Sequence, residues 1–115
     1  MQPIERELRI YQSADRRVPY QDWFDRLRDM RARQKIQARI ARLRLGNLGQ
    51  SRSLGEGVYE LKVDYGPGYR VYFGQDGPVL VILLCGGDKS TQRADIAKAK
   101  VYWFRYKQER KDAHH

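Results

Sequence analysis

The chain has 115 residues, 41% of them hydrophobic and 11% aromatic, which predicts one globular domain over residues 1–115 and argues against disorder. The formal net charge of +9, from 23 Lys and Arg against 14 Asp and Glu, favours a polyanionic or acidic partner. No apolar run is long enough for a transmembrane helix, the first residues lack the apolar core of a signal peptide, and the single cysteine excludes an internal disulfide. We therefore expect a cytoplasmic protein without a membrane partner, and we assign no function to His114 and His115.

The first half of the chain predicts one strand and two helices. Residues 4–11 alternate loosely between apolar and polar side chains, as a strand does. Pro19 suits the first position of a helix, and apolar residues then recur at helical spacing as far as Met30. A second helix is expected over about residues 32–45, where the stretch GNLGQ ends it. Its apolar face comprises Ile36, Ile40 and Leu43.

The second half predicts three strands and a final helix. Residues 58–63 and 69–73 alternate on either side of a GPG turn, and residues 78–85 are apolar throughout, which indicates a strand covered on both faces. Ser90 or Thr91 can cap the final helix. The order β-α-α-β-β-β-α predicts an α+β fold in which a small antiparallel sheet packs against the helices. The expected core includes Leu61, Val71, Ile82 and Trp103.

The positive charge is concentrated in two blocks. Residues 26–52 hold nine Lys and Arg and one acid, and residues 98–111 hold six and one. Such blocks are often solvated faces, but this excess also favours contact with a polyanion. Arg39 and Arg42, on the second expected helix, are therefore candidate substrate-binding residues.

The stretch GPGYRVYF, residues 66–73, sets an arginine into a strand beside a rigid turn. A three-residue loop would place Asp64 opposite Arg70 and Lys62 opposite Tyr72, with all four on the polar face of the hairpin. Either this is a solvated face with an Asp64–Arg70 pair, or it is a phosphate site. In a phosphate site Arg70 offers a guanidinium fork, Lys62 a second charge, and Tyr72 a stacking or hydrogen-bonding group. The spacing alone does not separate these two interpretations.

Several other chemistries are disfavoured by the sequence. There is no internal histidine and no Cys/His cluster with metal-ligand spacing, so we expect neither histidine-based catalysis nor a bound metal or other cofactor. Cys85 ends an apolar strand. A cysteine at such a position is more commonly a small buried residue than a nucleophile.

The stretches YELKVDYGPGYRVYF and LLCGGDKSTQRADIAKAK, taken at this separation, resemble the RelE/ParE toxin superfamily of bacterial toxin–antitoxin modules. Within it, the chain looks most like the HigB-like group called addiction module killer proteins, over nearly its whole length. The resemblance implies two N-terminal helices against a small antiparallel sheet with a C-terminal helix. It also implies a ribosome-dependent mRNA endonuclease that inhibits translation and is neutralised by a cognate antitoxin, expected to be a small helix-turn-helix protein.

The resemblance also assigns residues. The arginine of the family's YR strand falls on Arg70, where it would contact the scissile phosphate, and the basic residues before and after fall on Lys62 and Lys89. The chain departs from RelE at Glu60, where RelE has lysine, and near Asp95, where RelE has a catalytic tyrosine.

The chemistry expected from these residues is metal-independent cleavage with the 2′-hydroxyl of RNA as nucleophile. Lys62 would be the base, since a like charge nearby disfavours its charged form, and Arg70 would act electrostatically because it keeps its proton. Lys89 would be a second cation or the general acid. The alternatives are a non-catalytic ParE-like toxin acting on DNA gyrase, or an inactive relic that only binds its antitoxin.

Overall fold

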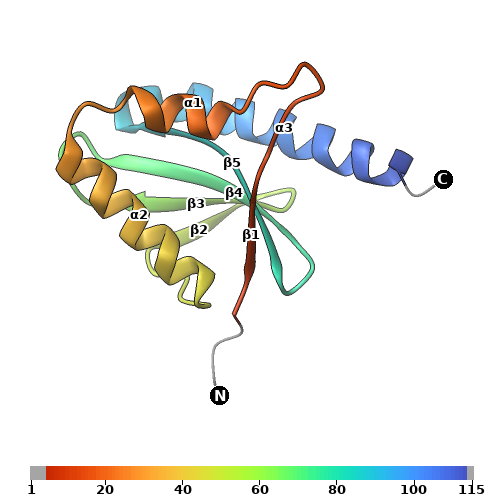
Figure 1. Cartoon of the computed structure of the whole chain (residues 1–115), viewed down its shortest axis with the longest axis horizontal. Coiled ribbons are helices and arrows are strands. Elements are labelled where there is room, and N and C mark those ends of the chain that lie inside the picture. The colour runs from red at the N-terminus through yellow and green to blue at the C-terminus, as the bar shows by residue number, and fades with distance from the viewer. Residues whose placement is uncertain (1–4, 114–115) are drawn as a thin grey trace.

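A five-stranded mixed sheet with helices on both faces forms the centre of the molecule (Figure 1). The computed structural model describes residues 5–113, so Ile4 of the first expected strand, and His114 and His115, lie outside it. In chain order the elements are β1 (Glu7–Ile10), α1 (Pro19–Arg26), α2 (Met30–Arg44), β2 (Ser51–Gly55), β3 (Val58–Val63), β4 (Tyr69–Asp76), β5 (Leu80–Asp88), the 3₁₀ turn η1 (Lys89–Thr91) and α3 (Gln92–Ala113). The α+β class is confirmed.

The sheet differs from the expected antiparallel meander in two respects. Its strand order is β1-β5-β4-β3-β2, and β1 pairs parallel to β5 while the other neighbours pair antiparallel. The extra strand, β2, occupies the edge and pairs with β3 through a tight turn at Glu56–Gly57, where both residues have positive φ. Its sequence, SRSLG, lacks the alternation of a half-buried strand because an edge strand can leave most of its side chains in solvent.

The boundary between the first two helices lies earlier than the apolar spacing predicts. α1 ends at Arg26, and the Asp29 carboxylate then accepts hydrogen bonds from the backbone N–H groups of Arg31 (3.0 Å) and Ala32 (3.2 Å). This N-cap satisfies donors at the first turn of α2 and separates the two helices. Met30 therefore begins α2 and is exposed rather than completing the apolar face of α1.

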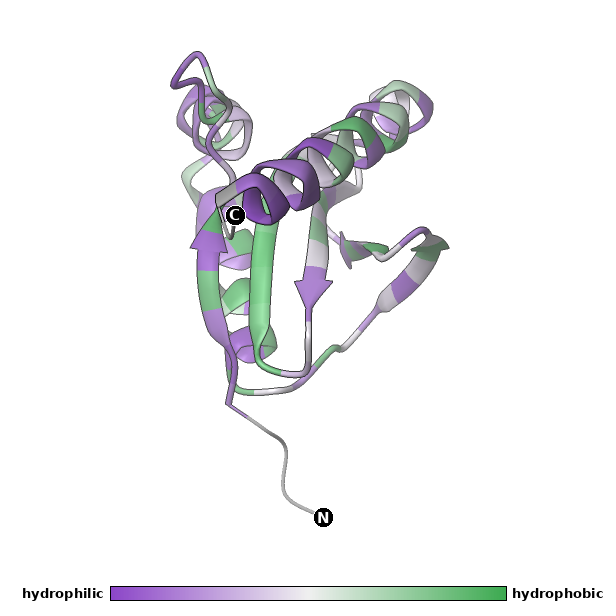
Figure 2. Cartoon of the chain, turned by 90° about the vertical axis from the view of Figure 1, so that its right-hand side faces the viewer, coloured by the Kyte–Doolittle hydropathy of each residue, from purple (hydrophilic) through white to green (hydrophobic). Residues whose placement is uncertain are grey.

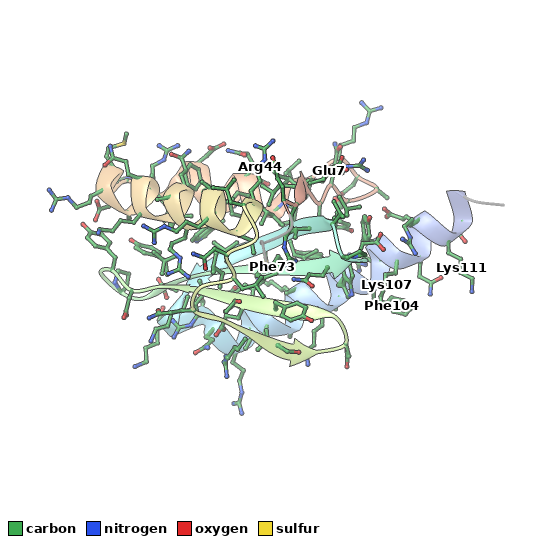
Figure 3. All side chains as sticks on the ribbon, turned by 90° about the horizontal axis from the view of Figure 1, so that it is seen from below. Glu7, Arg44, Phe73, Phe104, Lys107 and Lys111 are labelled. Atoms are coloured by element: carbon green, nitrogen blue, oxygen red, sulfur yellow. The ribbon has the colours of Figure 1, made fainter. Side chains whose placement is uncertain are left out.

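Two hydrophobic cores lie on opposite faces of the sheet. α1 and α2 cover one face, where Phe73 lies between the sheet and α2 (Figure 3), and α3 covers the other with Ala99 and Trp103. Trp103 packs so closely over Gly74 that any Cβ there would collide with the indole ring. β5 contributes to both cores, Val81 and Leu83 to one and Ile82 and Leu84 to the other, which confirms that this strand is covered on both faces. All four predicted core residues are buried, namely Leu61, Val71, Ile82 and Trp103.

The connection from β5 to α3 is capped one turn earlier than predicted. The Asp88 side chain, rather than Ser90 or Thr91, caps η1 by accepting from the Ser90 N–H at 2.8 Å. The Thr91 hydroxyl instead donates to the Asp95 carboxylate at 2.5 Å. From there α3 runs for 22 residues along the sheet and past its end (Figure 1). Within residues 5–113, none of the helices has the length and apolar character needed to cross a bilayer.

Candidate anion site on the β3–β4 hairpin

The hairpin joining β3 and β4 has a longer loop than the three residues expected. Residues 64–68 form the loop, so Lys62 pairs with Arg70 and Glu60 with Tyr72. The predicted Asp64–Arg70 pair is therefore wrong. The loop folds back through hydrogen bonds from the Tyr65 and Gly68 N–H groups to the carbonyls of Val63 and Tyr65, which removes Asp64 from the ladder.

A contact distant in sequence holds this loop in place. The Tyr65 hydroxyl donates to the Asp29 carboxylate at 3.1 Å, so the N-cap of α2 also anchors the hairpin. Asp64 is left exposed, and its carboxylate lies 3.9 Å from the ammonium of Lys62. The five-residue loop is therefore set by tertiary contact as well as by its two glycines.

Arg70 lies in a buried position with an acidic partner that the sequence did not indicate. Its side chain is 8% exposed, and its Nε lies 3.7 Å from Oε2 of Glu60, whose side chain is 4% exposed. Among the described residues the Arg70 Nε has no hydrogen-bond acceptor, and Nη1 donates to the Gly68 carbonyl at 2.7 Å. Arg70 is thus held by charge attraction at one end and by a backbone hydrogen bond at the other.

Gly68 allows this arrangement through both its conformation and its size. Its φ of 79° lies in the left-handed region, which other residues enter only at a cost. A Cβ at this position would lie 3.3 Å from Nη1 of Arg70 and 3.7 Å from Cβ of Lys89. The glycine therefore lets the guanidinium fold back against the loop, and the start of the Lys89 side chain lies next to the same glycine.

Glu60 is the centre of the site. It accepts hydrogen bonds from Arg52 Nε at 2.9 Å and from Gln92 Nε2 at 2.9 Å. Burial opposes ionisation of this carboxyl, but the two hydrogen bonds and the charge of Arg52 outweigh it and lower the pKa of Glu60 below its ordinary value. The carboxylate is therefore ionised at neutral pH and holds one side chain each from β2, β4 and α3.

These groups line a hollow of about 350 Å³ at the edge of the sheet. Arg52, Lys62 and Arg70 supply three positive charges to its wall against the single negative charge of Glu60. The surplus positive charge, on side chains that are already positioned, makes the hollow suited to an anion. Arg52 and Gln92 were not predicted from sequence, because each lies on an element whose position against β3 is set only by the tertiary fold.

The other predicted site residues are not all brought to this hollow. Lys89 is exposed on η1, and its Cβ and the Arg70 guanidinium both lie near Gly68. Tyr72 faces the same side of the sheet but is fully buried under α3, so its ring presents no open surface for stacking a base. Burial, followed by the nearby Glu60 charge, raises the pKa of Tyr72. Arg39 and Arg42 line a separate hollow on α2, which meets the first only at Gln50.

A third hollow, of about 470 Å³, lies between α1 and the start of α3. Arg17, Arg26 and Lys98 contribute its positive charges, but three aspartates balance them: Asp22, Asp88 and Asp95. Cys85 lies buried in its wall, and burial raises the pKa of the thiol to about 12. The burial expected for Cys85 is confirmed, and the balanced charge makes this hollow the weaker anion site.

Comparison with known proteins identifies a relative in Haemophilus influenzae. That protein, described as an uncharacterized protein, is 52% identical over 84 residues, which cover 73% of this chain and 85% of the relative. No family model matches the chain. No solved structure shows significant similarity to it.

Proposed function

We propose that this chain, which belongs to the same family as the uncharacterized Haemophilus influenzae protein, is a RelE/ParE-like toxin that cleaves mRNA on the ribosome. The YELKVDYGPGYRVYF and GGDKSTQ stretches support this assignment, because they resemble that superfamily. Two N-terminal helices on one face of a small sheet and a C-terminal helix on the other are compatible with a RelE-like arrangement. The protein would act in the cytoplasm.

One observation carries the proposal: Arg52, Lys62 and Arg70 surround a hollow in which Glu60 is the one acid among the described lining residues. A phosphodiester placed there would meet the guanidinium of Arg52, which is held by the Glu60 carboxylate, and that of Arg70, which is held by the Gly68 carbonyl of the loop. Preorganised cations stabilise the charge that develops on phosphorus without reorganising during the reaction. Glu60 is in our proposal a positioning residue, since it holds Arg52 and Arg70 and itself has both oxygens occupied.

The proposed reaction is transesterification within the RNA. Lys62 accepts the proton of the 2′-hydroxyl, and the oxygen attacks the adjacent phosphorus. The bond from phosphorus to the 5′-oxygen breaks, which gives a 2′,3′-cyclic phosphate and a 5′-hydroxyl. Arg70 stabilises the phosphorane charge and keeps its proton. Lys89, which lies on η1 near Gly68, donates a proton to the leaving oxygen or serves as a further cation.

A cognate antitoxin, in this proposal a small helix-turn-helix protein, neutralises the toxin. An acidic segment of it would be drawn to the basic surface over Lys62 and Arg70 or along α2, where Arg39 and Arg42 lie. Complementary charge of this kind mainly increases the association rate, so the rate should fall as salt is raised.

The test is cleavage by the purified chain of an mRNA on translating ribosomes, with primer extension to map the ends. We expect cuts that require translation and leave a 5′-hydroxyl, and no cutting of the same RNA without ribosomes. Supercoiling by DNA gyrase is measured in parallel. Inhibition of gyrase with intact mRNA would replace the proposal with a ParE-like function, and activity in neither assay would indicate a relic.

A further inference from the structure

The outward face of α3 carries an exposed apolar stripe. Val101 and Phe104 are 45% and 60% exposed, and the smaller Ala94 and Ala97 continue the stripe toward the start of the helix. Figure 3 shows Phe104 projecting from α3 away from the sheet. The opposite side of the helix, with Ala99 and Trp103, is buried in the core, so the stripe lies directly away from the molecule.

The spacing of this stripe is that of a helix-pairing seam. Residues 94, 97, 101 and 104 follow one another at intervals of three, four and three, as the a and d positions of a heptad do. At 1.5 Å per residue the four positions span about 15 Å, or roughly three turns. An extended strand or a loop would not match this spacing, whereas a second helix would.

The flanks of the stripe determine which helix can pair with it. The five e and g positions beside it are all basic, namely Arg93, Lys98, Lys100, Arg105 and Lys107. Four of them are exposed and Lys100 is half-buried, and the Lys107 ammonium lies over the Trp103 ring, 5.7 Å from its centroid. Nearby acids are few: Glu109 lies beyond the stripe, one turn after Arg105, and Asp112 lies in the last turn of the helix.

This charge pattern disfavours a second copy of the chain. In parallel pairing g faces e of the partner, and in antiparallel pairing g faces g and e faces e, so lysine and arginine would face each other in both cases. A helix with acidic residues at the same positions would instead form ion pairs along both sides of the seam. Nucleic acid would match the cations, but it offers less apolar surface to cover Val101. An acidic protein helix is therefore a better match for this surface than RNA.

We propose that the α3 stripe, defined by Ala94, Ala97, Val101 and Phe104, is the docking surface for an acidic amphipathic helix of a different protein. This surface lies outside the hollow formed by Arg52, Lys62 and Arg70, and the inference does not depend on the proposed nuclease function. Figure 2 shows α3 crossing in front of the sheet with apolar segments among polar ones.

The probe is a synthetic 21-residue helical peptide with leucine at the a and d positions and glutamate at e and g. Its binding to the full chain is measured by fluorescence anisotropy, with a scrambled peptide of the same composition as control for the net charge of +9. We expect the patterned peptide to bind at least about tenfold more tightly than the scrambled one, and to weaken as salt is raised. Equal binding of the two peptides would overturn the proposal.

Matched variants locate the site. Phe104→Glu should weaken peptide binding about tenfold or more, because it places a charge in the seam. Met30→Glu is the control, since this substitution adds the same charge at a residue on α2 that is 63% exposed. Lys100→Glu should weaken the glutamate peptide and improve a peptide with lysine facing that position. Equal affinities for the two glutamate variants at residues 30 and 104 would overturn the assignment.

Two competing occupants give distinct results. Sedimentation that finds a wild-type dimer, and a monomer for Phe104→Glu, would make the occupant a second copy and reject an acidic partner. An oligouridylate that displaces the peptide and loses affinity in Phe104→Glu would assign the stripe to RNA and equally reject the proposal. A monomer whose peptide complex resists oligouridylate is the result we expect.

Discussion

Replacement of Arg70 by alanine separates a structural role from a catalytic one. The side chain is 8% exposed and faces Glu60 at 3.7 Å. Removal of one partner of a buried ion pair costs about 3–5 kcal/mol when the remaining charge is left uncompensated. Glu60 keeps its hydrogen bonds to Arg52 and Gln92, and its contact with Arg70 is longer than a hydrogen bond. We therefore expect Arg70→Ala to lose only about 1–2 kcal/mol of unfolding free energy and to remain folded.

The expected loss of activity is much larger than this loss of stability. If Arg70 stabilises the phosphorane, its removal should lower the rate of mRNA cleavage by about 10²–10³, the effect of removing one preorganised donor to a transition-state anion. Arg70→Lys should recover only part of the rate, because an ammonium does not reproduce the two-pronged guanidinium contact. Urea denaturation gives the stability of each variant, and primer extension on translating ribosomes gives the rate.

A matched control replaces an arginine that lies outside the hollow. Arg9 pairs with Glu7 on the exposed surface of β1, so Arg9→Ala should change both stability and cleavage by little. A folded Arg70→Ala protein that cleaves at the wild-type rate would remove Arg70 from the site and contradict the reasoning.

Four further outcomes follow from the structure. Ile82→Ala should cost about 2–5 kcal/mol of unfolding free energy, because Ile82 is fully buried in the α3-side core, and a loss under about 0.5 kcal/mol in urea denaturation would contradict that packing. Gly68→Ala should cost about 1–2 kcal/mol in the same assay, from left-handed strain, and should also slow cleavage because it displaces Arg70. The pKa of Glu60 is lowered from the ordinary value of 4.5, so its ionised carboxylate should stabilise the fold at pH values above 4.5, and this stabilisation should be lost as the pH falls below that value. In thermal melts, the melting temperature of Glu60→Gln should therefore fall less steeply with acidification than that of the wild type. Cys85, with a pKa of about 12, should react with a thiol reagent at pH 8 far more slowly in the native protein than in denaturant, and equal rates would show that it is exposed.

The sequence alone predicted the elements whose signals are local. The alternation in β3 and β4 and the apolar run in β5 indicate which side chains are buried, and Leu61, Val71 and Ile82, predicted from them, lie in the cores. The hairpin also indicated Lys62 and Arg70 as neighbouring cations on one face, because that follows from strand alternation.

The tertiary structure decided what those cations contact. The register depends on a loop held by the hydrogen bond from Tyr65 to Asp29, which are 36 residues apart in the sequence. The partner of Arg70 is Glu60 rather than Asp64 because the longer loop moves the pairing along β3. Burial of Tyr72 depends on α3 crossing that face of the sheet. Each of these features arises from a contact between distant segments, and no local pattern of residue types encodes such a contact.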